Sequence, residues 1–86
     1  MPRFFFDTYD GVNLLSDDIG QELESIAAAK AEARRALPDM GRDPFPDGDR
    51  RTFIISVRNA AGKVILRLAL LLMIDDEFSQ AGAVTL

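Results

Sequence analysis

The sequence contains no cysteine and no histidine, and these two absences remove the commonest enzyme mechanisms. Without cysteine there is no disulfide framework, thiolate nucleophile or cysteine-rich zinc site. Without histidine there is no Ser-His-Asp triad, Cys-His pair or HExxH zinc helix. Neither GxxxxGK[ST] nor GxGxxG occurs, so no phosphate-binding loop is indicated. We therefore expect no enzyme, no catalytic residue and no cofactor.

Long apolar segments are also missing. The N-terminus reaches Asp7 after three phenylalanines, whereas a signal peptide needs an apolar region of about 7 to 15 residues. The longest apolar run, residues 64–74, contains Arg67 and is about half as long as a membrane helix. We expect a cytoplasmic protein with no membrane partner.

What is present fits a single folded domain. The chain has 86 residues, of which 48% are apolar and 28% charged, enough for one compact core. We predict one domain over 1–74 and a C-terminal tail over 75–86. The tail is expected to be frayed, to add an edge segment, or to fold back over the domain.

The charge is unevenly distributed along the chain. A net charge of −4 disfavours non-specific binding of nucleic acid, which is therefore not expected as a partner. Yet residues 30–67 hold nine of the ten basic side chains and carry a net charge of +4. This asymmetry could orient two copies or attract an acidic partner, although a solvated mixed surface is the simpler interpretation.

The first part of the chain predicts a hairpin. Residues 3–9 are rich in phenylalanine and end at Asp10-Gly11, and an Asp-Gly pair between apolar stretches is the strongest short hairpin signal. We predict a strand over 3–9, a tight turn, and a short strand over 12–15. A turn-forming cluster follows over 16–20.

An amphipathic helix is expected next, with Ser25 as its N-cap. Pro38 removes a backbone donor and clashes with the preceding turn, so the helix ends near Leu37 or continues to Met40 with a kink. We favour the end near Leu37. A loop follows over 41–49, with Phe45 plugged onto the core. The apolar residues at helical spacing are Leu23, Ile26, Ala29, Ala33, Ala36 and Leu37.

The second half predicts a β-hairpin. Residues 52–58 alternate apolar and polar side chains, 59–62 form a short turn, and 64–74 continue the apolar face. The element order predicts an α+β fold of two layers, β-β-α-β-β. It contains an antiparallel four-stranded sheet with one amphipathic helix packed on one face.

Several of these segments carry a family resemblance. Pro2-Arg3-Phe4-Phe5-Phe6-Asp7 opens the chain, and Met40-Gly41-Arg42-Asp43 continues into Pro46-Asp47-Gly48-Asp49. With Asp10-Gly11 and the Asp17 to Gly20 turn, these segments resemble a family of short alphaproteobacterial, rhizobial-type proteins classed as a domain of unknown function. The resemblance covers residues 2 to about 72 and implies the fold unit. It implies no activity.

The remaining chemistry-bearing groups are carboxylates and aromatic rings. Paired acids occur at Asp17-Asp18, at Asp47-Gly48-Asp49 and at Asp75-Asp76-Glu77. None has the spacing of a calcium loop, so we expect no metal site and assign these acids to turns and solubility. RNA binding on the sheet would need exposed aromatics, but we expect two of Phe4, Phe5 and Phe6 to face the helix, which leaves one ring on the far face.

The functional prediction comes from the strand pattern. Period-2 geometry leaves an apolar group on the sheet face opposite the helix, and such a group on a soluble domain indicates an interface or a surface covered by the chain's own tail, residues 78–86. We expect a non-enzymatic interaction module, most simply a homodimer. The alternative is a small regulatory nucleic-acid-binding or antitoxin-like protein, and a carboxylate-based enzyme is the least favoured. The candidate interface residues are Phe5, Ile54, Ala69, Leu71 and Met73.

Overall fold

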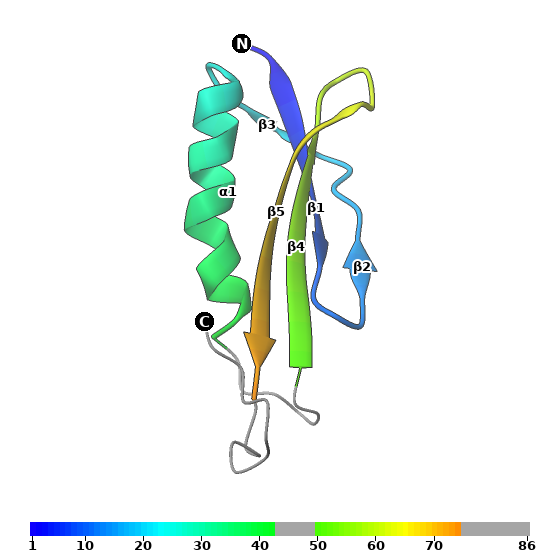
Figure 1. Cartoon of the computed structure of the whole chain (residues 1–86). Coiled ribbons are helices and arrows are strands. Elements are labelled where there is room, and N and C mark those ends of the chain that lie inside the picture. Colours follow the sequence, from blue (N-terminus) through cyan, green and yellow to red (C-terminus); the bar gives the residue numbers. More distant parts are fainter. Residues whose placement is uncertain (43–49, 75–86) are drawn as a thin grey trace.

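Residues 1–42 and 50–74 are described by the computed structural model shown in Figure 1. An antiparallel sheet forms one layer and a single helix forms the other, which confirms the predicted α+β class. The elements are β1 (Arg3–Tyr9), β2 (Leu14–Leu15), β3 (Gln21–Glu22), α1 (Ile26–Met40), β4 (Arg50–Arg58) and β5 (Val64–Met73).

The strand order is β2-β1-β4-β5, and β3 pairs with the other end of β1. All these pairs are antiparallel, and β4 lies in the middle, between β1 and β5. The helix α1 packs against β4 and β5 to the same extent. One face of the sheet is therefore covered by α1, and the opposite face has no covering element among the described residues.

The core lies between α1 and the strands. Strand β4 contributes Phe53, Ile55 and Val57, which are at most 3% exposed, because alternate residues of a strand point to the same side. From β1, Phe4 is buried and Phe6 packs against the cluster, while Phe5 lies on the opposite face. Two of the three phenylalanines thus face the helix, as predicted.

Helix α1 begins as the sequence predicts. The Ser25 side chain accepts a hydrogen bond from the backbone N–H of Ala28 at 3.1 Å, which satisfies one of the free donors of the first turn. Ala29 and Ala33 are fully buried, because their small side chains let the helix approach the sheet closely, and Leu37 is 8% exposed.

The favoured end of the helix near Leu37 is wrong, and the alternative extent is observed: α1 continues to Met40 with Pro38 inside it. Pro38 lies in the last turn, so its missing N–H affects only the carbonyl four residues earlier. The helix ends with backbone hydrogen bonds that span three residues in place of four. The Gly41 N–H donates to the Pro38 carbonyl at 3.1 Å, and the Arg42 N–H donates to the Asp39 carbonyl at 3.3 Å.

The turn after β1 is wider than predicted, so β2 is shorter. The Asp10 carboxylate accepts hydrogen bonds from the backbone N–H groups of Val12 and Asn13 at 2.9 and 2.7 Å. These bonds hold Val12 in the turn, and β2 contains only Leu14–Leu15. Strand β3 was not predicted, and it makes the sheet five-stranded.

Several predictions fall on residues 43–49 and 75–86, which lie outside the described residues. They concern Phe45, the acids of 47–49 and 75–77, and the C-terminal tail. Within the described residues, no helix is long and apolar enough to cross a membrane.

Candidate functional site

The sheet face opposite α1 divides into a polar end and an apolar end. Cross-strand pairing sets the rows of this face: Phe5 lies opposite Arg58, and Asp7 lies opposite Ser56, which in turn faces Arg67. These two rows form the polar end. In the remaining rows of this face, most side chains are apolar, and these rows form the apolar end.

A bidentate ion pair holds the polar end together. The Arg58 Nε donates to Asp7 Oδ2 at 2.6 Å, and its Nη2 donates to Asp7 Oδ1 at 3.0 Å. The same Nη2 donates to the Asp17 carbonyl at 2.9 Å, and the guanidinium lies 5.1 Å from the centre of the Phe5 ring. Two N–H···O bonds in parallel fix the plane of the guanidinium, so Arg58 covers Phe5 and limits its exposure.

Asp17 fills a gap in the hydrogen bonding of β1. Strands β2 and β3 pair with the two ends of β1 and leave its middle unpaired on that edge. There the Asp17 carboxylate accepts a hydrogen bond from the Phe6 N–H, and also from those of Ile19 and Gly20, each at 3.0 Å.

Gly20 closes this turn in a conformation that favours glycine. Its φ is +77°, and an added Cβ would lie 2.8 Å from the Phe5 ring. The turn, the ion pair and Phe5 therefore form one packed unit, the Asp7–Asp17–Arg58 cluster.

The carboxylates of this cluster are held in the ionised form. The hydrogen bond from Arg58 lowers the pKa of Asp7, and hydrogen bonds from the Gly20 and Phe6 N–H groups lower the pKa of Asp17. Because both acids are committed to donors, neither is poised to give or take a proton near neutral pH. The described residues contain no group of three possible metal ligands. The hydrogen bonds thus give the cluster a structural role at the edge of β1.

Acid should destabilise the fold through this cluster. The folded pKa values of Asp7 and Asp17 lie below the unfolded value of about 3.9, so their contribution is fully present above about pH 4. It is lost as the pH falls through the lowered folded pKa values. We expect the urea concentration at the unfolding midpoint to decrease when the pH is lowered below about 4. This decrease should be smaller in the Asp17→Asn variant than in the parent protein. An equal acid loss in both proteins would contradict this assignment.

The apolar end forms the candidate interface, which we call the sheet patch: Tyr9, Ile54, Ala69, Leu71 and Met73. Tyr9, Ile54 and Ala69 stand in one row, and Leu71 and Met73 follow on β5 in the next two rows. Leu71 is 55% exposed and Met73 is 43% exposed. Phe5 shares this face but lies two rows away, under Arg58. The structure thus brings four of the five sequence-predicted interface residues together.

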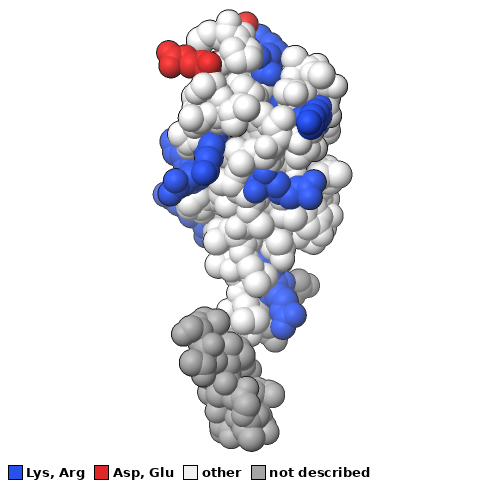
Figure 2. Space-filling model, turned by 45° about the horizontal axis from the view of Figure 1, so that its top comes forward, with Lys and Arg blue, Asp and Glu red and all other residues white. Residues whose placement is uncertain are grey.

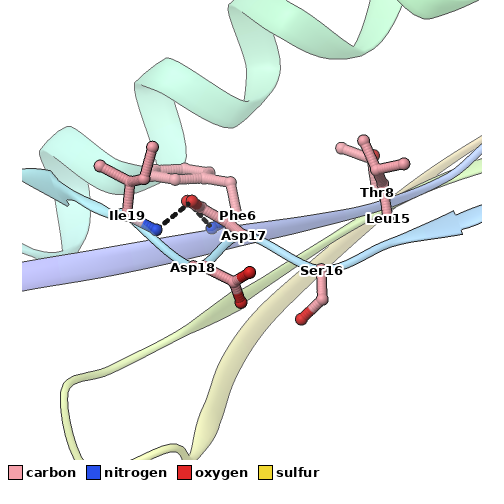
Figure 3. Close-up of a pocket in the computed structure, with 7 residues that line it drawn as sticks. All are labelled: Phe6, Thr8, Leu15, Ser16, Asp17, Asp18 and Ile19. Atoms are coloured by element: carbon pink, nitrogen blue, oxygen red, sulfur yellow. Dashed lines mark hydrogen bonds between the residues drawn. The ribbon is translucent and has the colours of Figure 1, made fainter.

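A hollow of about 420 Å³ lies on the helix side of the sheet, beside α1. In Figure 3 the side chains of Thr8, Leu15 and Ile19 rise toward the helix, and those of Ser16 and Asp18 point away from it. The Asp17 carboxylate at its floor is already bonded to backbone N–H groups. The hollow therefore offers mainly apolar contacts and few free polar partners. It is not continuous with the sheet patch, which lies on the other face.

Comparison with family models matches residues 3–71 to the domain of unknown function DUF6894. The chain belongs to this family. The match spans the whole Asp7–Asp17–Arg58 cluster and all of the sheet patch except Met73. Comparisons with curated proteins and with solved structures found no match to this chain. The resemblance noted from the sequence is therefore confirmed at the level of a domain of unknown function.

Sequence reasoning missed Tyr9 as a member of the patch in this DUF6894 domain. Tyr9 is half-buried, and its hydroxyl donates to the Gly11 carbonyl at 3.1 Å, so its ring lies along the face beside Ile54. Tyr9 has an odd residue number, as Phe5 does, and residues two or four apart in a strand point to the same face. This spacing was the available signal that Tyr9 shares the face of Phe5. A second exposed apolar group also went unnoticed, at 66 to 79% exposure: Val12, Leu14, Leu15 and Ile19.

Proposed function

We propose that this DUF6894 protein is a non-enzymatic interaction module that forms a homodimer through the sheet patch. The observation that carries the proposal is the exposure of Leu71 and Met73, side by side on the uncovered face of a regular sheet. Large apolar side chains that gather on one face of a folded domain mark an interaction surface.

The layout of the patch supports a twofold pairing. In an isologous dimer the same surface serves both copies, so one apolar group is sufficient. The patch has an apolar centre, while the polar Thr52 and the charged Arg50 and Arg67 stand around it on the same face. This is the usual anatomy of an interface, with an apolar core and a polar rim.

The non-enzymatic character is supported by the commitment of Asp7 and Asp17 to hydrogen bonds, together with the lack of histidine and cysteine. The nucleic-acid-binding or antitoxin-like alternative has no observation in its favour, because the one phenylalanine ring on the open face is covered by Arg58. The cytoplasmic location and the alphaproteobacterial origin stay predictions.

The oligomeric state of the full chain tests the proposal. We expect a dimer by light scattering and sedimentation, and we expect Leu71→Lys to weaken it at least about 30-fold, because a central apolar anchor is worth about 2 kcal/mol or more. Val64→Lys is the matched control: Val64 is 43% exposed on the same strand but far from the patch, and this variant should stay dimeric.

Circular dichroism should show that all three proteins are folded. A parent chain that is monomeric up to near-millimolar concentration would rule out the homodimer. A parent dimer that Leu71→Lys does not weaken would place the interface elsewhere.

A further inference from the structure

The outer edge of β5 is long and has no partner strand among the described residues. Residues Val64–Met73 pair with β4 on one side, and no other described strand pairs with them on the other side. The pairing with β4 is regular except near Val57 and Arg58, and β5 contains no proline. Such an edge presents a row of backbone N–H and C=O groups that another polypeptide can complete.

Basic side chains flank this edge on the helix layer. The two sides of α1 differ: Ala28, Glu32 and Ala36 are half-buried, whereas Lys30 and Arg34, on the opposite side, are exposed. Because α1 packs equally on β4 and β5, its more buried side lies over the interior of the sheet. Lys30 and Arg34 therefore overhang the edge of β5.

A further cation stands on the other face of the same strand. Arg67 is exposed on β5, and its Nε donates to Ser56 Oγ at 3.1 Å. Figure 2 shows blue side chains at the left, where α1 lies, and again right of centre, whereas red appears only at the upper end. Among the described residues, Lys30, Arg34 and Arg67 have no carboxylate partner. Five other arginines do have one: Arg3, Arg35, Arg42, Arg51 and Arg58.

These cations argue against a second copy of the chain at this edge. Antiparallel pairing of β5 with its own copy would place the two α1 helices side by side on the same face, at the 8 to 10 Å spacing of packed helices. Lys30 and Arg34 of one copy would then meet the same residues of the other. Like charges at that spacing oppose association, and edge lysines are a known guard against it.

We propose that the β5 edge binds an extended acidic segment of a partner protein, which adds to the sheet as a further strand. Cations on both faces of the edge match acids at adjacent positions of such a strand, because successive side chains point to opposite faces. A polypeptide is favoured over a nucleic acid because only its backbone supplies both donors and acceptors to the edge. The inference deepens the proposed interaction role and rests on it, but it uses the edge of β5 and not the sheet patch; Arg67, at the rim of the patch, borders both.

The test uses the full chain and a fluorescein-labelled nine-residue peptide in which pairs of adjacent glutamates alternate with pairs of valines, so that both faces of the added strand carry acids. Arg34→Gln and Arg67→Gln should each weaken binding by about two- to fivefold, the range for one exposed charge pair. Arg35→Gln, one residue on but turned away from the edge and paired with Glu32, should leave it unchanged. A peptide with N-methyl groups at alternate backbone nitrogens should bind at least tenfold more weakly. Addition of the unmethylated peptide should change the NMR chemical shifts of the backbone amides of β5.

Several results would overturn the inference. One is no binding by the parent chain at millimolar peptide, and another is equal losses in Arg34→Gln and Arg35→Gln. A third is tighter binding of a ten-nucleotide oligothymidine than of the peptide, which would assign the cations to nucleic acid. Repeating the titration with Leu71→Lys separates the two proposals, because the dimer can fail while peptide binding at β5 persists.

Discussion

Replacing Ile55 by alanine is expected to lower the free energy of unfolding by about 3 to 4 kcal/mol, the largest effect of any single substitution considered for this domain. Ile55 is 2% exposed and lies in the central strand, between Thr8 of β1 and Leu68 of β5. The helix above it presents Ala29 and Ala33, whose short side chains cannot move in to fill the space. The cavity therefore stays open, and its cost adds to the lost burial.

Ile54→Ala is the matched control. Ile54 is the same residue type in the same strand, but it lies on the uncovered face and is half-buried, so we expect a loss of only about 1 kcal/mol. Both variants should be compared in the Leu71→Lys background, because a dimer would add its own binding energy to the apparent stability. Urea unfolding that gives equal losses for the two variants would contradict the observed register.

The period-2 pattern predicted the main strands and their inward residues because these strands have one face under a helix. Phe53, Ile55 and Val57 are buried and the residues between them are only half-buried, so the alternation of the sequence is present in the structure. Strand β3 could not be predicted in the same way. It has only two residues, Gln21–Glu22, both exposed, and it is held by pairing to β1 and by the Leu23 N–H on the Pro2 carbonyl.

Part of the candidate site is formed by contacts between residues that lie far apart in the sequence. Ile54, Ala69, Leu71 and Met73 come from one hairpin, whose short turn fixes their register. Tyr9 joins them only through the pairing of β1 with β4, and the Asp7–Arg58 ion pair depends on the same pairing. Neither the residue spacing nor the local pattern contains that register, so the sequence predicted the four patch residues of the hairpin and did not predict Tyr9.

The end of α1 is a second place where contacts distant in the sequence outweigh a local sequence signal. Pro38 is a strong local signal for helix termination, and the prediction followed it. The structure keeps the helix to Met40 because Leu37 is buried and Met40 packs against the core, and because Gly41 and Arg42 supply donors to the last carbonyls. Packing of the final turn thus outweighs one missing hydrogen bond.

The second large effect is expected at Asp17. Asp17→Ala removes the acceptor of three backbone N–H groups at once, those of Phe6, Ile19 and Gly20. A hydrogen bond to a charged group contributes about 1.5 to 3 kcal/mol when buried, but these groups are partly exposed and water can replace some of the loss. We therefore expect unfolding to become easier by about 2 to 3 kcal/mol, with Asp17→Asn recovering roughly half because it keeps one acceptor oxygen.

The neighbouring residue supplies the control for this prediction. Asp18 has the same charge and adjoins Asp17, but it is exposed and has no hydrogen bond among the described residues. Asp18→Ala should therefore change stability by no more than about 0.5 kcal/mol. Urea unfolding at neutral pH measures both variants, and amide exchange at Phe6 should quicken only in Asp17→Ala, because that N–H loses its partner. Equal destabilisation by the two variants would mean that the negative charge of this turn, and not the bonding geometry of Asp17, stabilises the edge of β1.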